Sequence, residues 1–164
     1  MAAAGEVPRL EGRPVYGATP ADAAVIEAIR AQRAAGLSVI FYPFVLMEQM
    51  PGNGLADPWG GAEQARLPWR GRITCSVAPG RSGTVDGTAA ADAEVAAFFA
   101  GAWGFRDFIL HYARLCAEAG GVDGFCIGSE FVGLTRIRGA DGGFPAVAEL
   151  RALARRMRIA GYAG

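Results

Sequence analysis

The sequence lacks the excess of one charge sign and the long apolar runs that mark several classes of protein. Sixteen basic residues offset sixteen acidic ones, so the formal net charge is +0. A nucleic-acid surface normally shows a basic excess or stripe, and we therefore expect no nucleic-acid binding. The longest apolar run, Val39 to Met47, is interrupted by Pro43 and is too short to span a bilayer. The first residues resemble no signal peptide, so we expect cytoplasmic synthesis without membrane insertion.

Cysteine is scarce, and its spacing is not that of a disulfide framework. Cys75, Cys116 and Cys126 lie in apolar contexts and form no C-x-x-C pair. An odd number of cysteines in hydrophobic surroundings is typical of reduced, buried thiols and not of disulfides or a zinc site.

The motifs of common cofactor and nucleophile sites are missing as well. No Walker sequence and no G-x-G-x-x-G after a strand occurs, so nucleotide binding has no support. Ser129 lacks the G-x-S-x-G elbow because position 127 is isoleucine, and His111 is the sole histidine. We interpret His111 as a partly exposed helix residue. The sequence predicts neither a metal site nor a cofactor.

What the sequence contains is an alternation of predicted helices and strands in a chain of ordinary globular composition. Its 164 residues suffice for one domain with a sizeable core. A helix is expected to begin with Thr19 as its N-cap and to end at Gly36. Leu37 to Val45, rich in β-branched and aromatic residues, predicts a buried strand.

The remaining predicted elements continue this α/β order. Further strands are expected at Arg13–Tyr16, Arg72–Val77 and Val122–Gly128, and helices at Ala89–Phe99 (capped by Thr88), Phe108–Ala119 and Pro145–Met157. Tight helix-to-strand turns and long strand-to-helix loops are typical of a TIM-type barrel. A complete barrel needs roughly 250 residues, so the sequence predicts about half of a (β/α)8 barrel with parallel strands, or a smaller α/β sheet. Half a barrel has open strand edges, from which we expect self-association.

Glu130 is the strongest candidate for chemistry. The apolar run Val122–Gly128 ends abruptly in a serine and this glutamate. Catalytic groups of barrels sit where the strands end, and a carboxyl group there is placed for acid or base work. Its apolar neighbours Phe131 and Val132 predict that desolvation favours the neutral form. The alternative is a structural carboxylate that binds a loop backbone or an arginine.

Several motifs resemble one known family. In chain order they are Phe41–Met47, Gly52–Trp59, Pro68–Thr74, Asp86–Ala90, Phe125–Glu130 and Gly133–Gly139. Together they resemble the TIM-barrel-like domain of gene transfer agent and phage tail proteins, over about Gly12 to Leu153. The resemblance implies a glycoside-hydrolase-like barrel in a large tail-tip protein, with residues 1–164 as one domain and a fragment of that protein. It also implies assembly into a phage-tail-like particle with other tail proteins.

The resemblance further implies binding or cleavage of bacterial cell-envelope polysaccharide, with Glu130 as the proton donor. Glycoside hydrolysis needs a second carboxyl group, and Glu48, Asp57 and Asp86 are the alternatives within the chain. A non-catalytic structural or receptor-binding module of the tail hub stays open as the alternative function.

Loop residues supply the candidate contacts to substrate. The expected substrate-binding residues are Asn53, Asp57, Trp59, Trp69 and Asp86. Indole faces pack on the apolar faces of sugar rings. The alternative is that the two tryptophans anchor the long loop to the rest of the domain. Tyr42 is interpreted as a core residue of its strand.

Overall fold

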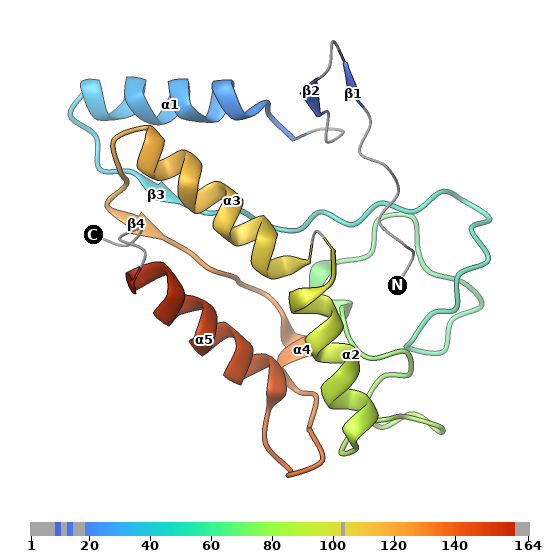
Figure 1. Cartoon of the computed structure of the whole chain (residues 1–164). Helices are drawn as coiled ribbons and strands as arrows, with labels where there is room; N and C mark the ends of the chain where they lie inside the picture. The colour runs from blue at the N-terminus through green and yellow to red at the C-terminus, as the bar shows by residue number, and fades with distance from the viewer. Residues whose placement is uncertain (1–8, 11–12, 15–18, 103, 160–164) are drawn as a thin grey trace.

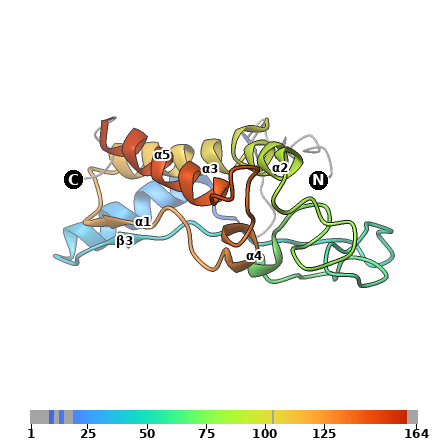
Figure 2. The same cartoon turned by 90° about the horizontal axis from the view of Figure 1, so that it is seen from below.

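Two short parallel strands run along a layer of helices (Figures 1 and 2). The computed structural model describes residues 9–10, 13–14, 19–102 and 104–159. Strand β3 (Ile40–Phe41) pairs in parallel with β4 (Gly124–Phe125), so that Ile40 lies opposite Gly124. A second pair, β1 (Arg9–Leu10) and β2 (Arg13–Pro14), is antiparallel and lies apart from this sheet. Arg13 and Pro14 of the strand predicted at Arg13–Tyr16 form β2, and Val15 and Tyr16 lie outside the described residues.

The longer helices pack against one another on one side of β3. They are α1 (Asp22–Ala34), α2 (Ala89–Ala100), α3 (Phe105–Glu118) and α5 (Pro145–Ile159). Helix α3 is central, because it contacts α1, α2 and α5. The short helices η1 (Arg70–Arg72) and α4 (Val132–Thr135) contact each other below this layer. No helix in the described part of the chain is long and apolar enough to cross a membrane.

Two apolar clusters hold these elements together. One joins α1 to α3 over β3, and its buried members include Ile29, Val39 and Cys116. The other joins α2, α3 and α5 to the segment after β4, where Phe131 and Leu134 are buried. The second cluster therefore fixes the chain on both sides of Glu130.

Helix ends follow local chemistry at some places and not at others. The Thr88 hydroxyl accepts a hydrogen bond from the Ala90 amide at 3.2 Å, which confirms it as the N-cap of α2. The predicted N-cap Thr19 is wrong, because α1 begins at Asp22 and its N-cap, Ala21, makes no side-chain bond. Gly120 and Gly121, at φ 98° and 93°, turn the chain after α3 as expected.

The predicted strand at Arg72–Val77 is not a strand. Residues 70–72 form η1, and the following residues bind other segments instead of a sheet neighbour. Glu94 of α2 accepts hydrogen bonds from the backbone amide and the hydroxyl of Ser76, at 2.6 and 2.8 Å. The parallel pairing of β3 with β4 agrees with the expected parallel strands, while the half barrel stays a prediction.

Candidate functional site

Glu130 follows the extended segment after β4 and has an unusual backbone conformation. Its φ is 58°, the sole positive φ of a residue other than glycine among the residues described. Side chains avoid this left-handed region, and such conformations gather at functional sites. The side chain is 47% exposed, so the carboxyl group faces solvent.

Both carboxyl oxygens of Glu130 are held by one dipeptide at the end of the 48–71 loop, one through a hydrogen bond and the other through an ion pair. The indole Nε1 of Trp69 donates a short bond to Oε2. The Arg70 guanidinium lies on the other oxygen, with Nη2 at 3.0 Å from Oε1. The loop thus reaches Glu130 across 61 residues of sequence.

Arg70 is largely enclosed, with a side-chain exposure of 15%. Its Nη2 donates a hydrogen bond to the Tyr42 hydroxyl at 3.2 Å, and the guanidinium carbon lies 4.8 Å from the Phe44 ring centroid. The Tyr42 and Phe44 rings lie 5.8 Å apart. We call these residues, together with Trp69 and Glu130, the Glu130 cluster. It presents one carboxylate beside three aromatic rings.

Two expectations about this cluster are wrong. Tyr42 is not a core residue, because it is 39% exposed. The carboxyl group of Glu130 is not enclosed by Phe131 and Val132, since Phe131 turns into the core and the Glu130 side chain is 47% exposed. The hydrogen bond from Trp69 and the ion pair with Arg70 are instead the contacts of the alternative interpretation, a structural carboxylate that binds an arginine.

Trp59 and Asp57 lie in a different part of the loop. The Trp59 indole donates to the Arg72 carbonyl at 2.8 Å, and the Arg72 guanidinium lies 5.6 Å from its ring centroid. Asp57 binds Nη2 of Arg72 at 2.9 Å and accepts from the Trp59 and Gly61 amides at 3.1 Å. Burial alone would raise the pKa of Asp57, but these hydrogen bonds outweigh it and hold that pKa below its ordinary value.

Asn53, Asp86 and Glu48 make bonds that shape the loops. Asn53 accepts from the Leu55 amide at 2.8 Å and donates to two loop carbonyls. Asp86 accepts from the Arg138 amide at 2.6 Å. Glu48 lies 3.5 Å from Arg66 on the surface. None of these bonds reaches the Glu130 cluster, so the structure brings Trp69 to Glu130 and leaves the other expected residues elsewhere.

A cavity of about 810 Å³ lies between the loop and α2. Trp59 and Asp57 line it, and its apolar wall includes Phe98 and Leu134; Glu130 does not line it. Cys75 lies in the same wall, where burial first, and then the charges of Glu94 and Asp86, raise its pKa to about 11.

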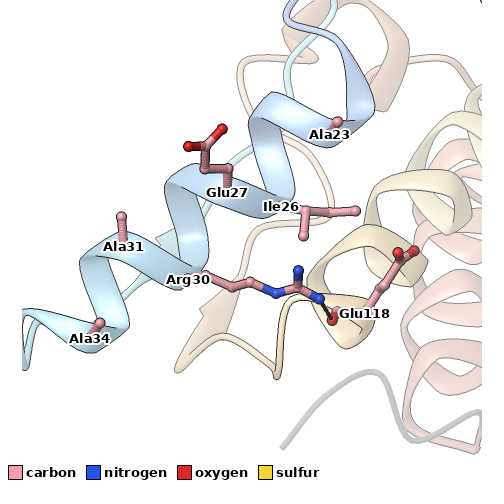
Figure 3. Close-up of a pocket in the computed structure, with 7 residues that line it drawn as sticks. All are labelled: Ala23, Ile26, Glu27, Arg30, Ala31, Ala34 and Glu118. Carbon is pink, nitrogen blue, oxygen red and sulfur yellow. Dashed lines mark hydrogen bonds between the residues drawn. The ribbon is translucent and has the colours of Figure 1, made fainter.

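A second cavity, of about 500 Å³, lies beside α1, and three of the seven residues that line it are alanines (Figure 3). Arg30 reaches across it and donates to the Glu118 carbonyl at 2.8 Å. His111 is held nearby in the helix layer, with Nε2 3.0 Å from Asp22. Neither feature offers a set of groups that converges on a ligand. In the described residues, no three His, Cys, Asp or Glu side chains are placed to hold a metal ion.

Sequence reasoning missed Arg70, Tyr42 and Phe44. Residues 39–46 are apolar or aromatic throughout, so the sequence does not mark the outward face that carries Tyr42 and Phe44, and Arg70 had no local signal either.

One comparison with known proteins bears on this site. Residues 103–163 match the family described as the GTA TIM-barrel-like domain, which is the family that the motifs suggested; the match includes the motifs Phe125–Glu130 and Gly133–Gly139, and the four earlier motifs lie outside it. The match spans α3, β4, Glu130, α4 and α5. None of the curated proteins compared with the chain matches it.

Proposed function

We propose that this chain has a tail-tip role in which the Glu130 cluster binds bacterial cell-envelope polysaccharide. The match of residues 103–163 to the GTA TIM-barrel-like domain supports a place in a gene transfer agent protein. The observation that carries this proposal is the grouping of one exposed carboxylate with exposed rings. Trp69 and Phe44 are each 51% exposed. Aromatic faces pack on sugar rings while a carboxylate accepts hydrogen bonds from sugar hydroxyl groups.

Binding is better supported than cleavage. A glycosidase needs two carboxyl groups about 5–5.5 Å or about 6.5–9.5 Å apart, and one of them must be neutral to donate a proton. Glu130 is bound by the two donors of Trp69 and Arg70. The contacts of the other candidate carboxylates, Glu48, Asp57 and Asp86, join them to residues outside the Glu130 cluster. Cleavage by the chain would therefore require a second carboxyl group.

The test is a binding and cleavage assay on glycan oligomers with the full chain and Glu130→Gln. Loss of the carboxylate is expected to weaken binding about tenfold, the effect of one hydrogen bond to a charged group. Trp69→Phe, which keeps a ring and removes the indole donor, is expected to lose less. Equal binding by the wild type and Glu130→Gln would remove Glu130 from the site, and release of reducing ends by the wild type alone would establish cleavage.

The second candidate is a non-catalytic structural or receptor-binding module of the tail hub. The pairing of the enclosed Arg70 with Glu130 favours it, because such a pair also holds a loop in place. Particles that assemble and adsorb normally with Glu130→Gln, yet fail with Trp59→Ala, would support this module over the sugar site.

A further inference from the structure

We infer that the Glu130 cluster takes an uncharged saccharide and that Arg70 is its positioning residue, acting on the ligand through Glu130. This inference rests on the proposed polysaccharide binding. It concerns the charge of the sugar and a residue that sequence reasoning had not assigned to any site.

The charge of the ligand follows from how the arginines of the 48–72 segment are paired. Arg66 pairs with Glu48 at 3.5 Å, Arg70 with Glu130 at 3.0 Å and Arg72 with Asp57 at 2.9 Å. Each cation of this segment thus already has an acidic partner. An anionic sugar would have to displace Glu130 from Arg70, whereas a neutral sugar leaves the pair intact.

Arg70 is placed to hold Glu130 and not to touch the ligand. Its side chain is 15% exposed, and its Nε is buried without a hydrogen-bond partner. Its Nη2 contacts both the Tyr42 hydroxyl and Glu130, and Phe44 lies against the guanidinium. A planar guanidinium fixed on several sides orients a carboxylate more strictly than a flexible ammonium group does.

Glu130 keeps acceptor capacity for the sugar. A carboxylate has about four lone-pair sites, and Trp69 and Arg70 each occupy one oxygen. The remaining lone pairs face solvent, where sugar hydroxyl groups would donate to them. The exposed ring of Trp69 contacts this carboxylate and that of Phe44 lies against Arg70, and these rings would meet the apolar face of the same sugar.

The first experiment measures binding of the full chain to immobilised envelope polysaccharides, sorted into uncharged and carboxylate-bearing preparations. Uncharged glycans are expected to bind at least tenfold more tightly. Tighter binding of the carboxylate-bearing group would overturn the inference while leaving the proposed polysaccharide binding in place. A wild-type chain that binds neither group would remove the proposed function, and the inference with it.

The second experiment is a double-mutant cycle on the tightest uncharged glycan, with Arg70→Met, Glu130→Gln and the double variant. Arg70→Met is expected to weaken binding about tenfold in the wild-type background and less than twofold in the Glu130→Gln background. Equal weakening in both backgrounds would mean that Arg70 contacts the sugar directly and would overturn the positioning role.

Two further variants separate positioning from a general loss of structure. Arg70→Lys keeps the charge and a single donor, so its affinity is expected between those of the wild type and Arg70→Met. Arg66→Met removes the exposed arginine of another pair in the same segment and is expected to leave binding within twofold. Thermal unfolding of each variant verifies that it folds. If Arg70→Met does not fold, Arg70→Lys alone decides, and unchanged affinity in that variant would overturn the inference.

Discussion

The backbone of Glu130 is held in a conformation that costs free energy. A residue with a Cβ atom loses roughly 1–2 kcal/mol in the left-handed region, and Glu130 has φ 58°. Its contacts with Trp69 and Arg70, and the burial of Phe131 next in sequence, offset that cost. Position 130 therefore carries a carboxylate side chain in a backbone conformation that would suit glycine better.

A matched pair of substitutions isolates this strain. Glu130→Ala and Glu130→Gly both remove the carboxylate and leave Arg70 equally unpaired. Because glycine adopts positive φ freely, Glu130→Gly is expected to be the more stable variant by about 1 kcal/mol, measured by urea unfolding. At most other positions the glycine variant is less stable than the alanine variant, because glycine loses more backbone freedom on folding. An alanine variant as stable as the glycine variant would contradict the assignment of strain.

The cysteines provide a second prediction at this scale. Burial raises the pKa of Cys75 and of Cys116 to about 11, whereas Cys126 is half-buried. The reactive thiolate is therefore almost absent from the two buried residues at pH 8 and increases only as the pH approaches 11. Iodoacetamide at pH 8 is expected to label Cys126 first in the native chain.

The control for this labelling is Cys126→Ser, which is expected to remain unlabelled until the chain is unfolded with urea. Rapid native labelling of that variant would show that the buried thiols are accessible.

Among the elements, α4 is the one whose packing places the site. A Cβ atom added at Gly133 would lie 2.6 Å from the Ile73 carbonyl oxygen and 2.8 Å from that of Gly71. Gly71 belongs to η1, which also carries Arg70. The absence of a side chain at position 133 thus allows the segment after Glu130 to approach the segment that binds it.

Gly133→Ala tests this close approach. Alanine is the better helix former by about 1 kcal/mol, so propensity alone predicts stabilisation. We expect the opposite, a loss of about 1–3 kcal/mol from overpacking against fixed backbone atoms, measured by urea unfolding. Val132→Ala, at a 46% exposed position of the same helix, is the control and is expected to change stability little. Stabilisation by Gly133→Ala would refute the contact.

Elements governed by local chemistry were predictable from the sequence. Helix α2 follows its Thr88 cap, and α3 ends at its glycine pair, because both signals act within a few residues. The strand expected at Arg72–Val77 failed because a strand needs a hydrogen-bonding neighbour, and Ser76 instead binds Glu94 of α2. Pairing across distant segments leaves no trace in local composition.

The same distinction separates the predicted from the missed site residues. Glu130 was identifiable because an apolar run ends next to it, and Trp69 because tryptophan is rare in a long polar loop. Arg70 resembles any surface arginine in the sequence. Its role depends on contacts with Tyr42 and Glu130, which are 28 and 60 residues away along the chain, and only the fold brings these together.

At the scale of the whole molecule, helices cover one face of the β3 segment, and within the described residues the other face stays exposed. Val39 and Pro43 are buried beneath the helices. The alternate residues point away from them, with exposures of 76% for Ile40 and 68% for Leu46. Together with Tyr42 and Phe44 they form an apolar stripe. Contiguous exposed apolar surface beside a short sheet favours association between molecules.

Self-association through this stripe is therefore expected, and substitutions outside the Glu130 cluster test it. Sedimentation velocity should show an average mass that rises with concentration for the wild type. Ile40→Thr combined with Leu46→Thr keeps β-forming tendency at position 40 and removes apolar area at both, so it should shift the mass toward that of the monomer. Leu37→Thr, at a 59% exposed position before the stripe, should not. A wild-type chain that stays monomeric at every concentration would mean that the open face does not drive contacts between copies.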